Sequence, residues 1–450
     1  MYDYDVVFLG SGHAAWHGAT ILARAGKRVA MVEANAVAGT CVNWGCNAKI
    51  LIDTPFELMD GLENYVGHGV EALPRMDWES LVAYKRKSVR AVRESLEATF
   101  VQEGIEVLHG RGHLLDEHVV AIEGRQAGTV CAEYVVICTG CRPARCDVPG
   151  GVLLHDSRDF MDLSVFPRRV AFIGAGLISM EFACIAAKLG VRPLVVEKGD
   201  RILPGYPRDY VECLVKKMNR DGVNFLLGEQ LASVERTKFG IRLTMESGDD
   251  YEVDYAVCAM GRVANVEDLG LERLGVACDE RGIEVDDFMR TTVPNVLATG
   301  DCVRKSEGRL TPTAEFESVY VARQILGSQE PLRYPAIPNV AYTLPRIAQC
   351  GVTVDDALAR PDDYRVERVP FGKNLTFMAK GDLLSDFTFV LDKDGCLVGC
   401  AVMGADAEDL INVAALVMNQ CLGRAQLEDM VFAFPTTSYG FISALAPLLA

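Results

Sequence analysis

The apolar residues near the N-terminus predict a strand, a helix and a second strand in succession. A short apolar run over residues 5–9 predicts a buried strand, and the residues after a glycine-rich turn predict a helix up to about residue 25. A second strand is expected over residues 28–32, directly before Glu33. This order is typical of the βαβ unit of a parallel sheet.

The same order of elements recurs in the middle of the chain. A strand is expected over residues 168–173, a helix up to about residue 189, and a strand over residues 193–196 that leads to Glu197. Two such units predict an α/β fold with two Rossmann-like dinucleotide-binding domains.

Small residues occupy the turn between strand and helix in both units. The first glycine of each turn permits a tight bend, and the second lets backbone N–H groups approach a pyrophosphate at the positive end of the helix dipole. We expect His13 and His17, at the start of the first helix, to pack or to contact phosphate. The predicted pyrophosphate-binding positions are Gly10, Gly12, His13, Ala14, Gly174 and Gly176.

Each unit ends in a carboxylate at the same distance from its turn. Glu33 lies 21 residues after Gly12, and Glu197 lies 21 residues after Gly176. A carboxylate at this spacing accepts hydrogen bonds from a ribose and repels a 2′-phosphate. Glu197 therefore favours NADH over NADPH, although the basic side chains of Lys198 and Arg201 nearby could attract the 2′-phosphate of NADPH.

Composition and charge exclude several classes of partner. The chain has 450 residues, of which 50% are hydrophobic, and a formal net charge of −17. Nucleic acids and anionic membranes bind basic surfaces, so neither is expected as a partner. Neither a secretory segment nor an apolar run long enough to span a membrane is visible, and we expect a cytoplasmic protein.

Two of the 15 cysteines, Cys41 and Cys46, stand in a glycine-containing segment that follows the first unit. In a regular helix, residues i and i+5 lie about 8–9 Å apart. A disulfide tolerates only about 4.4–6.8 Å between Cα atoms. A disulfide here therefore requires Cys41 to lie ahead of a regular helix or in a distorted first turn, which Gly39 and Gly45 allow. A nearby helix N-terminus would lower the pKa of a thiol.

Zinc binding and a purely structural role are the alternatives for these cysteines. Zinc would need two further ligands, and the other cysteine cluster has irregular spacing. Its members are expected to be one strand-end residue and two loop residues, and no metal centre is predicted. The cluster consists of Cys138, Cys141 and Cys146.

Several segments together resemble the flavin-dependent pyridine nucleotide–disulfide oxidoreductases, the family of dihydrolipoamide dehydrogenase, glutathione reductase and mercuric reductase. Residues 38–49 are similar to the family's redox motif, and residues 138–140 are similar to the end of one of its strands. Residues 260–262, 299–301 and 337–343 resemble a glycine–arginine turn, the segment that holds the flavin ribityl chain, and the start of the dimerisation domain.

The resemblance implies FAD and a nicotinamide cofactor, a homodimer and three domains. The FAD-binding domain would comprise residues 1–150 and 286–335, the NAD(P)-binding domain residues 151–285, and an α+β dimerisation domain residues 336–450. In the last of these we expect a hairpin of residues 387–391 and 396–399, and a helix from about residue 407 to 421. Further cofactor-binding positions carried over from the motifs are Thr40, Thr139, Gly140, Gly261, Arg262 and Asp301.

The resemblance also implies a route for electrons from NAD(P)H through flavin to a Cys41–Cys46 disulfide. Cys46 would be the thiol next to the flavin, and Cys41 the thiol that exchanges with a small-molecule disulfide or thiol-linked substrate. Lys49 would lie beside the flavin, paired with Glu181 of the second unit.

The C-terminal segment departs from the family pattern. Phe434 and Tyr439 stand where the family usually has a His–Glu pair that transfers protons for the interchange thiol, and all seven histidines lie at or before His155. Phenylalanine cannot transfer a proton, and a phenol ordinarily titrates near pH 10. Proton transfer from water or from Tyr439 is then one interpretation.

Phe434 also raises an alternative function. The carboxylating member of the family, which cleaves a ketopropyl thioether of coenzyme M, has phenylalanine at this position, and a dry apolar wall can keep protons from a carbanion. A reductase and carboxylase acting on a thioether ketone is therefore the rival hypothesis. Mercuric reductase carries a C-terminal cysteine pair that hands over the metal, whereas the last cysteine here is Cys421, so mercuric ion reduction is disfavoured. A non-catalytic flavoprotein is disfavoured because both motif cysteines, Lys49 and Glu181 are present.

Overall fold

A seven-stranded sheet forms the lobe that contains the N-terminus in the computed structural model, which describes residues 1–306 and 308–450. The strand order is β3-β2-β1-β6-β5-β4, and β18 pairs with β6. The parallel strands β1 and β2 are buried, which explains their continuous apolar runs. The strands are β1 (Tyr4–Leu9), β2 (Val29–Glu33), β3 (Glu106–His109), β4 (Arg111–Asp116), β5 (Val119–Glu123), β6 (Gly128–Ile137) and β18 (Val296–Ala298).

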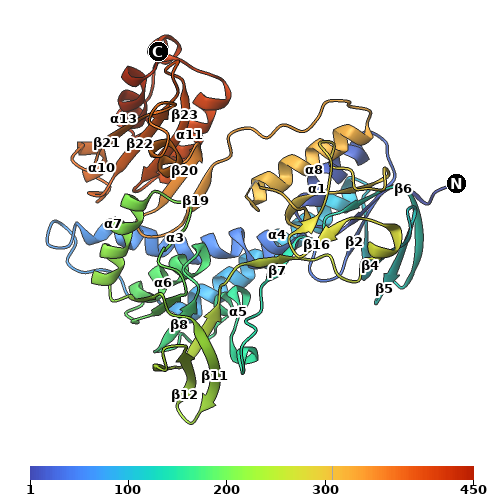
Figure 1. Ribbon diagram of the computed structural model, residues 1–450, viewed down its shortest axis with the longest axis horizontal. Coiled ribbons are helices and arrows are strands. Elements are labelled where there is room, and N and C mark those ends of the chain that lie inside the picture. The colour runs from blue at the N-terminus through green and yellow to red at the C-terminus, as the bar shows by residue number, and fades with distance from the viewer. Residues whose placement is uncertain (307) are drawn as a thin grey trace.

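Two helices from distant parts of the chain, α1 (His13–Arg24) and α8 (Thr311–Ile325), pack side by side in this lobe (Figure 1). A Cβ atom at Gly18 would lie 2.4 Å from the carbonyl oxygen of Ser318, so only glycine permits this approach. The Gly18 N–H donates a 2.9 Å hydrogen bond to the Ser318 hydroxyl. The chain thus returns to the N-terminal lobe after forming the second one.

The second lobe repeats the parallel arrangement on a smaller scale. A four-stranded parallel sheet has the order β10-β9-β8-β14, and a three-stranded antiparallel sheet, β11-β12-β13, extends from it (Figure 1). The elements are β8 (Val170–Ile173), α6 (Leu177–Lys188), β9 (Leu194–Glu197), α7 (Arg208–Arg220), β10 (Asn224–Leu227), β11 (Leu231–Thr237), β12 (Gly240–Met245), β13 (Asp250–Val253) and β14 (Tyr255–Cys258).

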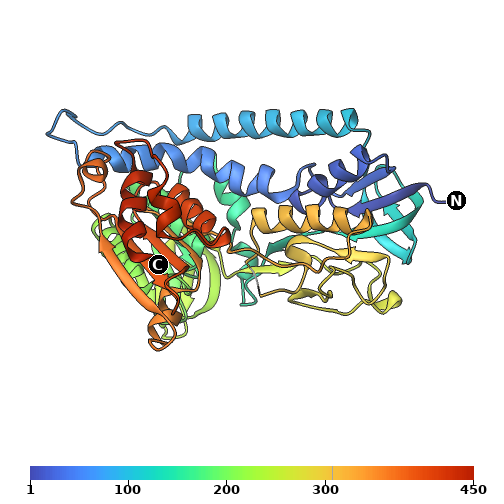
Figure 2. The same ribbon diagram turned by 90° about the horizontal axis from the view of Figure 1, so that it is seen from above.

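Two long helices and a two-stranded ribbon connect the lobes. Helices α3 (Cys46–Glu63) and α4 (Trp78–Gln102) run along the length of the molecule (Figure 2), and β7 (Cys141–Pro143) pairs with β15 (Arg262–Ala264). The remaining short elements are α2 (Gly39–Trp44), η1 (Gly151–Leu153), α5 (Ser157–Met161), η2 (Glu272–Leu274), β16 (Cys278–Asp279), β17 (Gly282–Ile283) and η3 (Gly300–Cys302).

The C-terminal lobe is a five-stranded antiparallel sheet with helices packed on it. Its order is β19-β20-β23-β22-β21, and α11 lies against β20 and β23. The elements are β19 (Asn339–Ala341), β20 (Ile347–Gly351), α9 (Val354–Leu358), β21 (Arg365–Pro370), α10 (Leu375–Met378), β22 (Asp386–Leu391), β23 (Leu397–Met403), α11 (Ala407–Asn419), α12 (Arg424–Glu428), α13 (Thr437–Leu445) and η4 (Ala446–Leu448).

A buried cationic side chain ties this lobe to α3. Arg346 is 1% exposed, and its Nη2 lies 2.7 Å from Oδ2 of Asp53 and 2.5 Å from Oε2 of Glu57. Glu408 of α11 accepts a further 3.0 Å hydrogen bond from the Arg346 Nε. Removing one partner of such a buried cluster leaves uncompensated charge and is strongly destabilising. The cluster therefore holds the C-terminal lobe on the helix that begins at Cys46.

The structure confirms the elements predicted for both βαβ units, with boundaries that agree within two residues. The predicted hairpin in the C-terminal lobe is also confirmed, although β23 continues to Met403 and α11 ends at Asn419, before residue 421. One prediction is wrong: Cys141 lies in β7 and not in a loop, because β15 pairs with this short segment.

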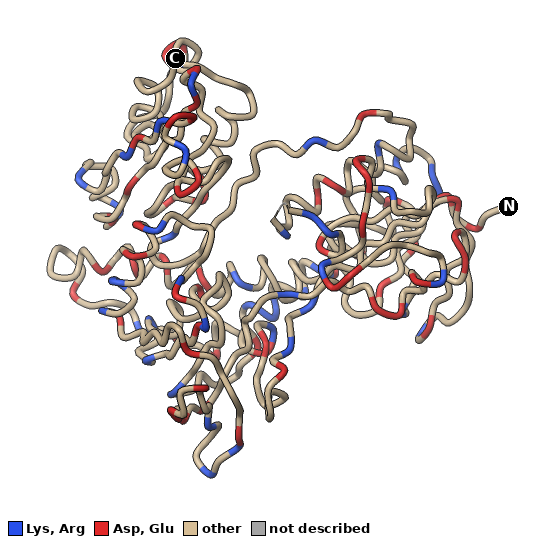
Figure 3. The backbone as a smooth tube through the Cα atoms, in the orientation of Figure 1, with Lys and Arg blue, Asp and Glu red and all other residues tan. Residues whose placement is uncertain are grey.

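Charged residues of both signs are interspersed along the backbone of all three lobes (Figure 3). Among the described residues, no helix combines the length and the apolar character needed to cross a membrane.

Candidate active site

A cavity of about 850 Å³ opens between the N-terminal and second lobes. This volume lies within the usual range of about 300–1,000 Å³ for small-molecule sites. Residues from both lobes and from α2 and α3 line it, and most of the predicted site residues are among them. Those residues are Gly10, Gly12, His13, Ala14, Glu33, Thr40, Cys41, Cys46, Lys49, Thr139, Gly140, Glu181, Arg262 and Asp301.

The first glycine turn lines this cavity. Gly10 has a φ of +126°, and a Cβ there would lie 2.5 Å from the carbonyl oxygen of Cys138, so glycine is required. Gly12 is the N-cap of α1 and has extended backbone. The first backbone N–H groups of α1 have no partners within the helix and carry its positive dipole end, which suits an anionic ligand.

Glu33 is held rigidly at the end of β2. Its Oε2 accepts hydrogen bonds from the backbone N–H and the hydroxyl of Ser11, at 3.1 and 2.5 Å, and its Oε1 accepts one from the Asn35 N–H at 2.7 Å. The carboxylate is 9% exposed and lines the cavity. It is therefore a fixed hydrogen-bond acceptor on the cavity wall.

The second unit repeats this arrangement outside the cavity. Glu197 accepts hydrogen bonds from the N–H groups of Ala175 and Gly199, both at 2.8 Å. Gly174 has a φ of +99°, and Gly176, the N-cap of α6, has open space where a Cβ would point. The two units are thus structural duplicates, and the second has room for a phosphate at its turn.

The two motif cysteines lie on either side of a helix break. Cys41 belongs to α2, Cys46 is the first residue of α3, and Gly45 between them has φ −128° and ψ −126°. A Cβ at Gly45 would lie 3.0 Å from both the Cys41 Cα and the Thr40 carbonyl oxygen. The distortion expected for a disulfide at this spacing is therefore present, and it depends on glycine.

The environments of the two thiols differ in the dithiol state that the structure represents. A hydrogen bond from the Cys41 thiol lowers the pKa of Cys46 to about 6, assisted by the Thr311 hydroxyl, which lies 3.3 Å from the Cys46 sulfur, and by the charge of Lys49. The same interaction with Cys46, together with burial, raises the pKa of Cys41. Cys46 is thus the thiolate of the pair at neutral pH, and Cys41 keeps its proton.

Removing the Thr311 hydroxyl is expected to raise the pKa of Cys46. A hydrogen bond to a charged group contributes about 1.5–3 kcal/mol, so Thr311→Val should raise this pKa by about one to two pH units. Thr311→Ser retains the hydroxyl and is the matched control. The measurement is the rate of Cys46 alkylation by iodoacetamide in reduced enzyme between pH 5 and 9, with the modified peptide identified by mass spectrometry. Identical profiles for Thr311→Val and wild type would contradict this role of Thr311.

Lys49 and Glu181 form a buried ion pair beside Cys46. The Lys49 Nζ lies 3.0 Å from both oxygens of Glu181, whose side chain is 6% exposed. The Tyr342 N–H donates a 2.9 Å hydrogen bond to Glu181, and the Lys49 Nζ lies 3.7 Å from the centre of the Tyr342 ring. Residues from the second and C-terminal lobes therefore position this lysine of α3 at the cavity wall.

Asp301 and Arg262 meet at a third cysteine on the cavity wall. The Cys141 thiol donates a 2.9 Å hydrogen bond to Asp301, and the Arg262 Nε lies 2.9 Å from the Cys141 sulfur. Burial, reinforced by the Asp301 charge, raises the pKa of Cys141 to about 12, so this residue remains a thiol. Gly261, next to Arg262, has a φ of +108° and does not line the cavity.

Comparison with protein families agrees with this geometry. Residues 4–324 match the model of the pyridine nucleotide-disulphide oxidoreductases, and residues 337–444 match the model of the dimerisation domain of the same family. The chain belongs to the pyridine nucleotide-disulphide oxidoreductase family. Members of this family are flavoproteins that use FAD and NAD(P)H.

Individual relatives of this oxidoreductase cover nearly its whole length. Dihydrolipoyl dehydrogenase of Chlamydia muridarum is 30% identical over 96% of the chain and 94% of the relative. Glutathione reductase of Burkholderia cepacia is 29% identical over 98% of each chain. A copper(II) complex of a mutant of the HOCl-induced flavoprotein disulfide reductase RclA from Escherichia coli has the same fold, with a TM-score of 0.90, 22% identity and complete coverage of both chains.

The residues of this oxidoreductase fit the family's FAD in the cavity. At Gly12, which lines the cavity, a Cβ would meet only the Gly39 Cα at 3.7 Å, so the backbone of the turn is open to a ligand, and Glu33 is held as an acceptor. The Nε2 atom of His13 is buried and lacks a partner among the described residues. Cys46 and Lys49 line the same cavity.

Two side chains of the cavity have no local sequence signal and were not predicted. Thr311 starts α8, far from the cysteine motif in sequence, and reaches Cys46 only because α8 packs on α1. Arg158 of α5 lies over the Trp44 ring, with 3.9 Å between the guanidinium carbon and the ring centre. Only the tertiary packing of the chain brings these residues to the site.

Phe434 and Tyr439 lie outside the cavity, on the C-terminal lobe. Their rings pack edge to face with centroids 5.2 Å apart, and the side chains are 75% and 39% exposed. Among the described residues of a single chain, these two side chains therefore do not reach the Cys41–Cys46 pair.

Proposed function

We propose that this oxidoreductase passes electrons from NADH through FAD to a Cys41–Cys46 disulfide and on to a low-molecular-weight or protein disulfide. One observation carries the proposal: the Gly45 helix break places both cysteines in the wall of the same cavity as the Lys49–Glu181 pair and the first glycine turn. When bound, FAD would supply the two-electron step between nicotinamide and protein disulfide.

The two thiols have complementary roles in the exchange that follows. Cys41, once deprotonated, attacks a substrate disulfide, which forms a mixed disulfide and releases one substrate thiolate. The Cys46 thiolate then attacks the Cys41 sulfur, which restores the Cys41–Cys46 disulfide and releases the second thiolate. The low pKa of Cys46 supports its resolving role, and the raised pKa of Cys41 means that the first step needs a proton acceptor.

We infer a homodimer in which the C-terminal segment of one chain completes the site of the other. The dimerisation domain of the family supports this inference. Large apolar side chains are exposed on this segment, including Val431 at 100% and Phe434 at 75%, and contiguous exposed apolar residues mark interaction surfaces. Phe434 and Tyr439 would then face Cys41 of the partner subunit.

A thioether ketone is the second candidate substrate, and Phe434 is the observation that favours it. With no acid at this position, the pocket would suit a reaction in which a carbanion must be kept from protons. Phe434 packs edge to face against Tyr439, so the two rings together form an aromatic surface.

Anaerobic reduction followed by a substrate screen separates the candidates. The purified enzyme is titrated with NADH and then offered disulfides, or thioether ketones with bicarbonate, while reoxidation is followed optically. Reoxidation by a disulfide supports the first proposal, and reoxidation by a thioether ketone alone supports the second. If NADH leaves the Cys41–Cys46 disulfide intact, both proposals fail.

NADH is expected to be preferred over NADPH because Glu197 repels a 2′-phosphate. Two basic residues nearby could favour NADPH. Arg201 is paired with Asp355 and donates a hydrogen bond to the Tyr206 carbonyl, and Lys198 is exposed. Glu197→Gln removes the charge, and it should raise kcat/KM for NADPH by about tenfold, equivalent to about 1.4 kcal/mol. Steady-state assays with both cofactors measure this change, with exposed Glu235→Gln as a control of equal charge change. Equal kcat/KM values for the two cofactors in wild type would remove the argument.

A further inference from the structure

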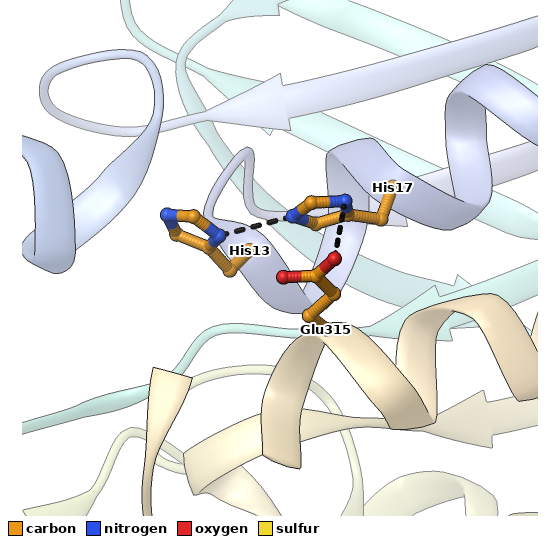
Figure 4. A group of neighbouring side chains, drawn as sticks. All are labelled: His13, His17 and Glu315. Carbon is orange, nitrogen blue, oxygen red and sulfur yellow. Dashed lines mark hydrogen bonds and ion pairs between the residues drawn. The ribbon is translucent and has the colours of Figure 1, made fainter. Parts of the chain in front are cut away.

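Three potential metal ligands meet where α1 packs on α8, outside the proposed electron route. His13 and His17 lie one turn apart on α1, and Glu315 lies on α8 (Figure 4). The Nδ1 atom of His13 is 3.0 Å from Nε2 of His17, and Nδ1 of His17 is 3.4 Å from Oε1 of Glu315. One ligand atom from each residue can be chosen so that all three lie within 4.8 Å of one another.

The spacing of the histidines suits a bidentate chelate. Residues i and i+4 share one face of a helix, and two histidines at this spacing are an established helical metal-binding pair. With metal–nitrogen bonds of about 2.0–2.1 Å, nitrogens 3.0 Å apart subtend about 90–97° at the metal. This angle is close to that of a tetragonal or octahedral site and smaller than the tetrahedral angle that zinc prefers.

The surroundings hold the two rings in place. The His17 ring stacks on Trp16 with 3.5 Å between ring centres and an interplanar angle of 26°. The His17 side chain is 16% exposed, whereas Glu315 is 47% exposed and has freedom to move. In Figure 4 the second carboxylate oxygen of Glu315 is directed toward the side on which the two nitrogens face each other. A small rotation of this side chain would complete a three-ligand site that ions can reach from solvent.

We propose that His13, His17 and Glu315 form a binding site for a divalent transition-metal ion, with the donor set of two imidazoles and one carboxylate. Copper(II) and nickel(II) fit the 3.0 Å nitrogen spacing better than zinc(II) does. The ion would link α1, which carries the first glycine turn, to α8. The sequence predicts no metal centre because the spacing of its cysteines is irregular. Glu315 lies about 300 residues from the histidines and joins them only in the folded chain.

The thiols of Cys41 and Cys46 would compete for the metal ion, so the experiment must prevent them from binding it. Untagged FAD-loaded enzyme is used in its oxidised form, in which Cys41 and Cys46 would be joined as a disulfide. A Cys41→Ser, Cys46→Ser double variant removes both thiols whatever the redox state, and the ligand variants are also made in this protein. Nickel(II) is titrated by equilibrium dialysis with metal analysis, and copper(II) at less than one ion per chain is examined by electron paramagnetic resonance.

We expect one tight nickel(II) ion per chain and a copper(II) signal with coupling to two nitrogens. His17→Gln should leave one nitrogen coupled to copper(II). His17→Gln and Glu315→Gln should each weaken nickel(II) binding by at least about 10–100-fold, because losing even a residue that only hydrogen-bonds to a metal ligand typically costs that much affinity. His68→Gln, at an exposed histidine, is the control and should bind as wild type does. Bound nickel(II) should raise the thermal midpoint of wild type and of His68→Gln but not of the two ligand variants, since the ion binds the folded state.

Absence of binding by wild type overturns the proposal, as does unchanged affinity in either ligand variant. Glu315→Gln alters a half-exposed side chain and keeps the test decisive if His17→Gln does not fold. Flavin content and the metal-free thermal midpoint are compared first, so that lost binding is not mistaken for lost structure. The outcome is independent of the proposed electron route because no turnover is measured.

Discussion

The double variant Phe434→His, Tyr439→Glu is expected to reduce a simple disulfide such as lipoamide or glutathione disulfide faster than wild type. The substitutions restore a proton-transferring pair where the chain has two aromatic rings. General acid–base assistance contributes about 10²–10⁴-fold, so the gain should approach that range if the substrate can enter the site. Stopped-flow measurements should place the whole gain in the oxidative half-reaction, while reduction by NADH is equally fast in both proteins.

A matched variant distinguishes proton transfer from a simple opening of the pocket. Phe434→Leu, Tyr439→Gln removes both aromatic rings without adding an acid or base, and it should gain little. If it gains as much as the His–Glu variant, steric blocking explains slow turnover. If wild type already reduces a common disulfide as fast as NADH reduces the enzyme, Phe434 is no handicap, and the support for the thioether-ketone alternative is lost.

Cys41→Ser and Cys46→Ser are both expected to abolish disulfide reduction but to differ in absorbance. Each substitution removes one sulfur of the exchange, so neither variant can regenerate the Cys41–Cys46 disulfide. In Cys41→Ser the serine hydroxyl can still donate a hydrogen bond to Cys46, and Thr311 and Lys49 remain. Cys46 should therefore stay a thiolate at neutral pH and give a long-wavelength thiolate-to-flavin band without added NADH, whereas Cys46→Ser should lack the band.

The pH dependence of this band follows from the direction of the Cys46 shift. Because the pKa is lowered to about 6, the band in Cys41→Ser should persist at pH 8 and fade as the pH drops below 6. Cys278→Ser, at an exposed cysteine outside the cavity, should retain both turnover and the wild-type spectrum. A band that survives in Cys46→Ser would show that the assigned roles are reversed or wrong.

Much of the fold follows from local patterns in the sequence. The apolar runs of β1 and β8, the glycine turns after them and the acidic residues 21 positions later are all short-range signals, and the structure confirms the elements that they predict. Gly45 between the two cysteines is likewise a local signal, because only backbone distortion allows a disulfide at that spacing. The sequence thus determined the family, the two nucleotide-binding units and the cysteine pair.

Tertiary packing decided the environment of these groups. Thr311 reaches Cys46 because α8 packs on α1, and the Tyr342 N–H reaches Glu181 because Arg346 ties the C-terminal lobe to α3. Arg201 turned out to be held by Asp355 of the C-terminal lobe, which no local pattern indicates. Such contacts join residues more than a hundred positions apart, and they depend on the relative placement of whole lobes. Periodicity and spacing report only what a residue's chain neighbours require, so the thiol pKa values and the His13–His17–Glu315 cluster could emerge only from the folded chain.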